Sequence, residues 1–155
     1  MEHARPRIGV SKCLLGHEVR YDGGHTRDHY VESVLGQHVE WVSMCPEVEV
    51  GMGTPRPAVR LVRDGDTVRM ISSKGDYDWT ESMTTYSETQ VEHLAGESLD
   101  GFIFKKNSPS CGVYRIKVFD QNDVPSKDGR GLFAAEFMRR FPLIPVEEDG
   151  RLNDN

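Results

Sequence analysis

Three short apolar runs in this chain each end in a cysteine, and the sequence has no other cysteine. The runs occupy residues 8–13, 41–45 and 102–111. Short runs rich in β-branched and aromatic residues are typical of buried strands. In the third run the strand has to end before Cys111, because Pro109 lacks the amide hydrogen that a β-ladder needs. The pattern predicts strands that each present a thiol at the carboxyl end.

The size and composition predict one folded domain over residues 1–155. A chain of this length buries roughly 70% of the surface that it exposes when unfolded, so it needs no disulfide framework. With 37% hydrophobic and 28% charged residues, the composition is that of an ordinary globular protein. An odd number of cysteines also favours reduced thiols.

The charge balance limits the kinds of partner that we expect. The net charge is −6, which argues against a broad basic face for nucleic acid, because phosphate neutralisation supplies most of that affinity. A small-molecule substrate is favoured, although a local basic patch could still bind RNA. No apolar run approaches the ~20 residues of a membrane span, and the first residues lack the apolar segment of a signal peptide. We therefore expect a cytoplasmic protein with no membrane partner.

The order of predicted elements is that of an α/β protein. Strands are predicted over residues 7–12, 39–44, 102–104 and 143–146, and helices over 26–36, 78–97 and 132–141. Residues 58–62 and 67–72 are predicted to form a hairpin, 113–119 an extended segment, and 46–57 and 120–131 loops. Together they predict a mostly parallel, Rossmann-like sheet with flanking helices and an inserted β-hairpin.

The three cysteines are the strongest candidates for chemistry. Ligands of parallel sheets bind at the carboxyl ends of the strands, so Cys13, Cys45 and Cys111 are expected to share one crevice. Single buried cysteines usually act as small hydrophobic residues, but the polar neighbours of these three are unusual for a core. Three kinds of site stay open: a thiolate nucleophile, an iron-sulfur cluster, or a structural zinc with a fourth ligand from His17, His25 or His29.

Five motifs give the sequence a resemblance to a known family. They are residues 11–16 (SKCLLG), 19–23 (VRYDG), 45–47 (CPE), 53–57 (GTPRP) and 106–112 (KNSPSCG). In this order they resemble the bacterial 2-thiouracil desulfidase family, formerly a domain of unknown function, over nearly the whole chain.

The resemblance implies an enzyme that removes sulfur from a thiolated pyrimidine and releases hydrogen sulfide without net redox. It implies a 4Fe-4S cluster held by Cys13, Cys45 and Cys111, with a fourth iron open for the substrate sulfur. It also implies that Glu47 is the catalytic acid/base and Ser108 the catalytic serine, with Ser110 as the second choice. Related domains act on 4-thiouridine of transfer RNA, so tRNA is a less favoured substrate. A non-catalytic cluster or metal module is the alternative.

Other polar residues lie in predicted loops at the same edge of the sheet. Arg20, Tyr21, Asp22 and Arg56 are candidates to bind substrate oxygens or ring nitrogens. Turn stabilisation explains Asp22 equally well, because Asp-Gly is a common turn sequence.

Overall fold

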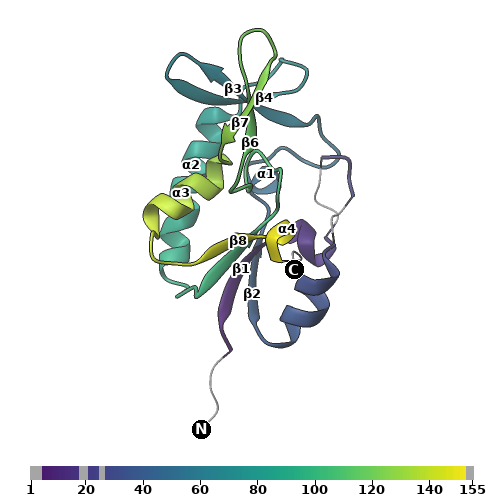
Figure 1. Ribbon diagram of the computed structural model, residues 1–155, viewed down its shortest axis with the longest axis vertical. Helices are drawn as coiled ribbons and strands as arrows, with labels where there is room; N and C mark the ends of the chain where they lie inside the picture. Colours follow the sequence, from purple (N-terminus) through teal and green to yellow (C-terminus); the bar gives the residue numbers. More distant parts are fainter. Residues whose placement is uncertain (1–4, 18–20, 25–26, 153–155) are drawn as a thin grey trace.

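The computed structural model describes residues 5–17, 21–24 and 27–152. They form two four-stranded sheets with helices (Figure 1). The strands are β1 (Arg7–Ser11), β2 (Glu40–Met44), β3 (Val59–Asp64), β4 (Thr67–Ser72), β5 (Gly101–Phe104), β6 (Ile116–Phe119), β7 (Pro125–Gly129) and β8 (Val146–Glu148). The helices are α1 (Pro46–Glu49), α2 (Thr80–Ala95), α3 (Leu132–Arg140) and α4 (Asp149–Leu152), with the short 3-10 or π segments η1 (Lys12–Leu15), η2 (Tyr30–Val34) and η3 (Leu35–Gln37).

The first sheet has the strand order β2-β1-β5-β8, and all its neighbouring strands are parallel. The carboxyl ends of β2, β1 and β5 therefore lie side by side at one edge. Close contact between β1 and β5 requires a glycine, because a Cβ atom at Gly9 would lie 2.2 Å from the ring of Phe102.

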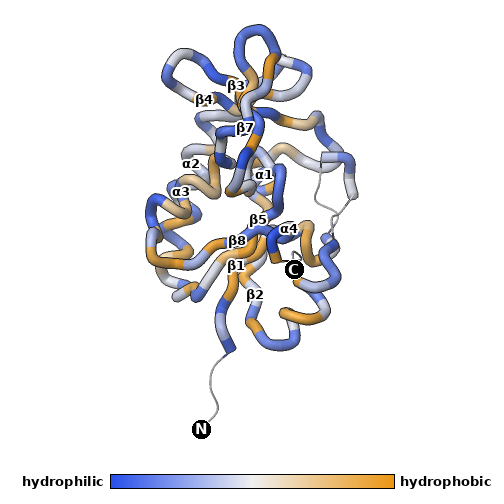
Figure 2. Tube along the Cα trace, in the orientation of Figure 1, coloured by the Kyte–Doolittle hydropathy of each residue, from blue (hydrophilic) through white to orange (hydrophobic). Residues whose placement is uncertain are grey.

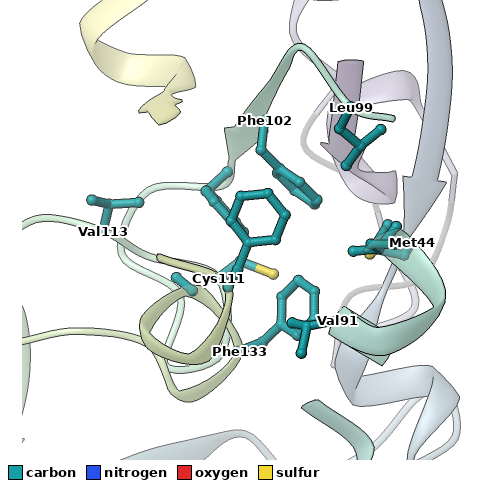
Figure 3. Close-up of a cluster of buried hydrophobic side chains, with 11 residues drawn as sticks. Met44, Val91, Leu99, Phe102, Cys111, Val113 and Phe133 are labelled. Carbon is teal, nitrogen blue, oxygen red and sulfur yellow. The ribbon is translucent and has the colours of Figure 1, made fainter. Parts of the chain in front are cut away.

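Both faces of this sheet are covered. Successive side chains of β5 point to opposite faces, so burying all of them requires cover on both sides. Phe102 and Phe104 belong to a cluster with Phe133 and Phe137 of α3 and with residues of α2, whereas Ile103 packs with residues of β1, η1 and η2 on the other face. Figure 3 shows Phe102, Phe133 and Cys111 among the side chains of this cluster. Burying each of these rings contributes roughly 1.5–3 kcal/mol. The flanking helices are thus placed by the apolar residues of the strands.

The second sheet has the order β4-β3-β6-β7, with β3 and β6 parallel and the other pairs antiparallel. Leu61 and Met70 pack against Met83 of α2. Figure 2 shows that the outer loops of this sheet are hydrophilic. The predicted hairpin exists as β3 and β4, but it belongs to this second sheet and is not inserted in the parallel one, because β3 pairs with β6.

Four predicted elements differ from the structure. Residues 120–131 contain β7, which sequence patterning missed because its side chains are almost all exposed. The last strand, β8, begins at Val146, which is the last residue of the predicted segment 143–146. The predicted loop 46–57 begins with α1. The predicted helix 26–36 is a π-helix followed by a 3-10 turn, and its predicted cap, Thr26, lies outside the described residues.

Within the described ranges, no helix is long and apolar enough to cross a membrane.

Candidate active site

The three cysteines follow three adjacent parallel strands. Cys13 lies in η1 directly after β1, Cys45 comes directly after β2, and Cys111 lies in the loop that follows β5. All three line one cavity of about 330 Å³. The parallel strand order brings them together, although they are far apart in the sequence.

The loop that carries Cys111 is held by the first turn of α3. The amide groups of Phe133 and Ala134 both donate to the carbonyl oxygen of Ser110, at 3.0 Å each. The helix fits against the loop because residue 131 is glycine: a Cβ atom on Gly131 would lie 2.5 Å from the carbonyl carbon of Ser110. The loop thus satisfies helix amides that have no partner within the helix.

Gly131→Ala is therefore expected to destabilise the protein by about 1–3 kcal/mol, because backbone of the Cys111 loop would have to move. Gly96→Ala, at the end of α2, is the matched control, because its added Cβ would meet its nearest neighbour at an ordinary 3.6 Å. Thermal denaturation of the two variants measures the difference. Equal stability of the two variants would show that the contact between α3 and this loop is not tight.

The turn that carries Cys45 is held from the side of α2. Pro46 is the first residue of α1, where a missing amide hydrogen costs nothing. The carboxylate of Glu49 accepts from the amide of Cys45 at 2.7 Å and from the hydroxyl of Tyr86 at 2.9 Å. Burial and the negative charge of Glu49 both raise the pKa of Tyr86, so this hydroxyl stays a donor. Through Glu49, the position of Cys45 is thus tied to a partly buried tyrosine on α2.

The surroundings of the cysteines suit metal ions. Burial raises the pKa of Cys45 and of Cys111, and the nearby thiols raise it further in both cases. Buried thiolates at such positions need compensating positive charge, which metal ions supply. Among the described residues, no group of three His, Cys, Asp or Glu side chains is placed to bind one metal ion. A cluster has a different requirement, because each of its cysteines binds a different iron atom.

Glu47 is the acid of the cavity, and both its oxygens have partners. Arg56 donates to Oε1 from Nη2 at 3.0 Å and from Nε at 3.3 Å. The Oγ of Ser110 donates to Oε2 at 2.9 Å. The arginine side chain is only 4% exposed and that of Glu47 14%, so this is a buried ion pair. It fixes Glu47 in one orientation at the wall of the cavity.

The two serines form a chain that ends at Glu47. The Oγ atoms of Ser108 and Ser110 lie 3.1 Å apart, and the amide of Cys111 donates to Ser108 Oγ at 3.0 Å. Because Ser110 donates to Glu47, its oxygen is free to accept from Ser108. Direct contact with Glu47 therefore belongs to Ser110, which sequence reasoning ranked second, and Ser108 connects to Glu47 through it.

The other predicted residues are divided between the cavity and the surface. Tyr21 and Arg56 line the cavity. Neither His17 nor His29 lines it, and both are exposed, so the structure does not bring these two possible zinc ligands to the cysteines. Asp22 accepts from the amide of Gly24 at 2.8 Å, which is the turn role that sequence reasoning left open. His25 and Arg20 lie outside the described residues.

Sequence reasoning missed several polar residues of the cavity. Ser11, Lys12 and Lys105 line it beside the cysteines. The buried Ser11 accepts from the amide of Lys105 at 3.0 Å, which ties the end of β1 to the end of β5. Lys12 directly precedes a cysteine and Lys105 directly follows β5, so position at strand ends was the signal that could have found both.

Comparison with known proteins places the chain in a family. The family described as 2-thiouracil desulfurase matches residues 8–149. The chain belongs to the 2-thiouracil desulfurase family. It is therefore a member of a family of enzymes.

Two individual proteins are similar to this member of the 2-thiouracil desulfurase family. An uncharacterised Bacillus subtilis protein, YbbK, is 32% identical over 111 residues, which is 68% of this chain and 72% of YbbK. A solved structure described as [4Fe-4S]-dependent thiouracil desulfidase TudS matches with a TM-score of 0.74 and 28% identity, over 96% of this chain and 93% of that one. The likeness to TudS extends over both sheets.

Proposed function

We propose that residues 1–155 act as one 4Fe-4S-dependent desulfidase domain. The reaction replaces the sulfur of a thiolated pyrimidine, such as 2-thiouracil, by the oxygen of water and releases hydrogen sulfide, with no net oxidation or reduction. Family membership and the similarity to TudS support this proposal. The observation that carries it is the placement of three cysteines and Glu47 around one cavity.

The residues present fit a cluster of this kind. Cys13, Cys45 and Cys111 would hold it as thiolates, and the cationic side chains of Lys12 and Lys105, which line the same cavity, would offset the negative charge. When bound, the cluster would supply an iron that acts as a Lewis acid toward the soft sulfur of the substrate.

Proton transfer falls to Glu47 and the serine chain. Water that adds to the thiocarbonyl carbon has to lose a proton, and the departing sulfur has to gain one, so one group that takes and returns a proton serves both needs. Glu47 is held at the cavity wall by Arg56 and Ser110. Ser108 extends this hydrogen-bonded chain toward the loop of Cys111 and orients water or relays the proton.

The alternative function is a cluster-binding module without catalysis. Protein purified without oxygen and incubated with 2-thiouracil is expected to produce uracil and sulfide in equal amounts. Cluster-loaded protein that leaves 2-thiouracil unchanged would favour the non-catalytic alternative.

Turnover of free 2-thiouracil is expected to depend little on salt. A free base makes no phosphate contacts, so kcat/KM should change by less than about twofold between low and physiological ionic strength. Steady-state kinetics over a potassium chloride series measures this. A steep fall in kcat/KM would show that long-range charge attraction drives binding of the free base.

A further inference from the structure

Two buried carboxyl groups take no part in the proposed proton transfer. Glu148 is the last residue of β8 and Asp149 the first residue of α4, and both are 6% exposed. The strand leads directly into the helix at this point (Figure 1). A buried carboxylate is costly unless hydrogen bonds or a positive charge compensate it, so the partners of each group indicate what it does.

Asp149 contacts the start of the loop that carries Cys111. Its Oδ1 accepts from the amide of Lys106 at 2.8 Å, and its Oδ2 lies 3.9 Å from Nζ of Lys105. A separation of 3.9 Å is that of an ion pair without a direct hydrogen bond. Because the side chain of Lys105 is only 17% exposed, water screens this attraction less than it would at the surface. One carboxylate therefore holds a backbone amide and an ammonium group together.

Parallel pairing of β5 and β8 makes Lys105 and Asp149 neighbours. In this register Phe104 lies beside Glu148, and Lys105 and Asp149 are the next residues along the two segments. On the other side of β5, the Oγ of Ser11 accepts from the amide of Lys105 at 3.0 Å. Lys105 is thus held from both strands that flank β5.

Lys105 brings a positive charge to the cavity of the cysteines. It lines that cavity, whereas Asp149 does not. An ammonium group has three donors, of which one is used by the carbonyl oxygen of Lys106 at 3.1 Å. Arg56, another cation of the cavity, is already hydrogen-bonded to Glu47. The ammonium group of Lys105 is therefore a fixed charge that keeps donors for the cavity.

We propose that Asp149 is a positioning residue for the iron-sulfur site: it holds the ammonium group of Lys105 at the cavity, where this charge favours retention of the cluster. The proposal rests on the proposed function for the presence of a cluster. A cluster with three thiolate ligands places negative charge in a partly buried site, and a fixed cation beside it lowers the free energy of that charge. Without the carboxylate, the flexible lysine side chain would regain its conformational freedom in water.

The test measures how fast the cluster-loaded protein loses iron to a chelator in the absence of oxygen. We expect Asp149→Asn to lose iron at least about threefold faster than the unsubstituted protein. Asparagine has the same shape and can still accept from the amide of Lys106, but it does not attract an ammonium group. Lys105→Met removes the ammonium group itself and should accelerate the loss similarly.

Glu148→Gln is the matched control. It makes the same chemical change at an equally buried carboxylate that accepts from two backbone amides and does not line the cavity of the cysteines. This variant should lose iron at the normal rate even if its melting temperature falls. Equal iron loss by Asp149→Asn and Glu148→Gln would overturn the proposal, as would normal iron retention by Lys105→Met.

A double-mutant cycle separates action through Lys105 from the direct effect of the carboxylate. The charge of Asp149 acts on the cluster whether or not Lys105 is present, so its direct effect cancels in the cycle. Asp149→Asn should accelerate iron loss in the unsubstituted protein and should no longer do so in the Lys105→Met protein. Equal acceleration in both backgrounds would show that Asp149 does not act through Lys105.

The same proteins distinguish this proposal from the proposed function. Coupling between Asp149 and Lys105 in loaded protein that leaves 2-thiouracil unchanged would refute the desulfidase activity and support the positioning role. Turnover without coupling would refute the positioning role alone. Protein that holds no iron after reconstitution would overturn both.

Discussion

Replacing Cys111 by alanine is expected to remove the iron and the acid-labile sulfide from the purified protein, and with them all turnover of 2-thiouracil. Cys13→Ala and Cys45→Ala should do the same. Two remaining thiolates leave a second iron without a protein ligand, and a cluster held that weakly is lost during purification. Iron and sulfide assays on protein prepared without oxygen, together with the rate of uracil formation, measure the effect.

Loss of packing has to be separated from loss of the cluster. Cys111 is 5% exposed and belongs to the core, so its replacement by alanine also leaves a small cavity. Ser87→Ala on α2 is the control, because Ser87 is equally buried, does not line the cavity, and its Oγ has no hydrogen bond to any described residue. The control should keep full iron content. Unchanged iron and sulfide in Cys111→Ala would exclude this cysteine as a ligand.

Glu47→Gln is expected to keep the cluster and to lose at least about a hundredfold in turnover, the usual scale for a general acid/base. Glutamine has the size of glutamate but cannot take up the proton that water loses. Ser110→Ala, which removes the direct contact with Glu47, should also slow the reaction, and Ser108→Ala should slow it if the hydroxyl orients water or relays the proton. Rates have to be compared per bound cluster.

The substitution of Glu47 also leaves the buried guanidinium of Arg56 without its carboxylate, which destabilises the protein. Glu148→Gln is the matched control: this carboxylate is 6% exposed, accepts two backbone amides and does not line the cavity of the cysteines. Its rate per cluster should be normal even if its melting temperature falls. Normal turnover by cluster-loaded Glu47→Gln protein would remove Glu47 from the mechanism.

The strands that precede the cysteines were predictable from the sequence. They lie inside a sheet, so their apolar residues form short runs that can be recognised. β1, β2 and β5 each have apolar cores bounded by polar turns, and their parallel order places Cys13, Cys45 and Cys111 at one edge. The division into two sheets was not predictable in the same way. It depends on pairing between β3 and β6, which are separated by β4, α2 and β5 and carry no sequence signal of their partner.

The polar contacts of the site were predictable only in part. Glu47 and both serines came from the family motifs, but which serine contacts the acid depends on how the loop that follows β5 folds against α3.

The most direct measurement for this account is the metal and sulfide content of the protein purified without oxygen, with its visible absorption. We expect about four iron and four sulfide per chain and a brown protein, as a 4Fe-4S cluster requires. Loss of the colour in air is expected too, because an iron without a protein ligand is exposed to oxidants. Colourless protein that contains zinc, or no metal even after reconstitution with iron and sulfide, would contradict the assignment of the three cysteines.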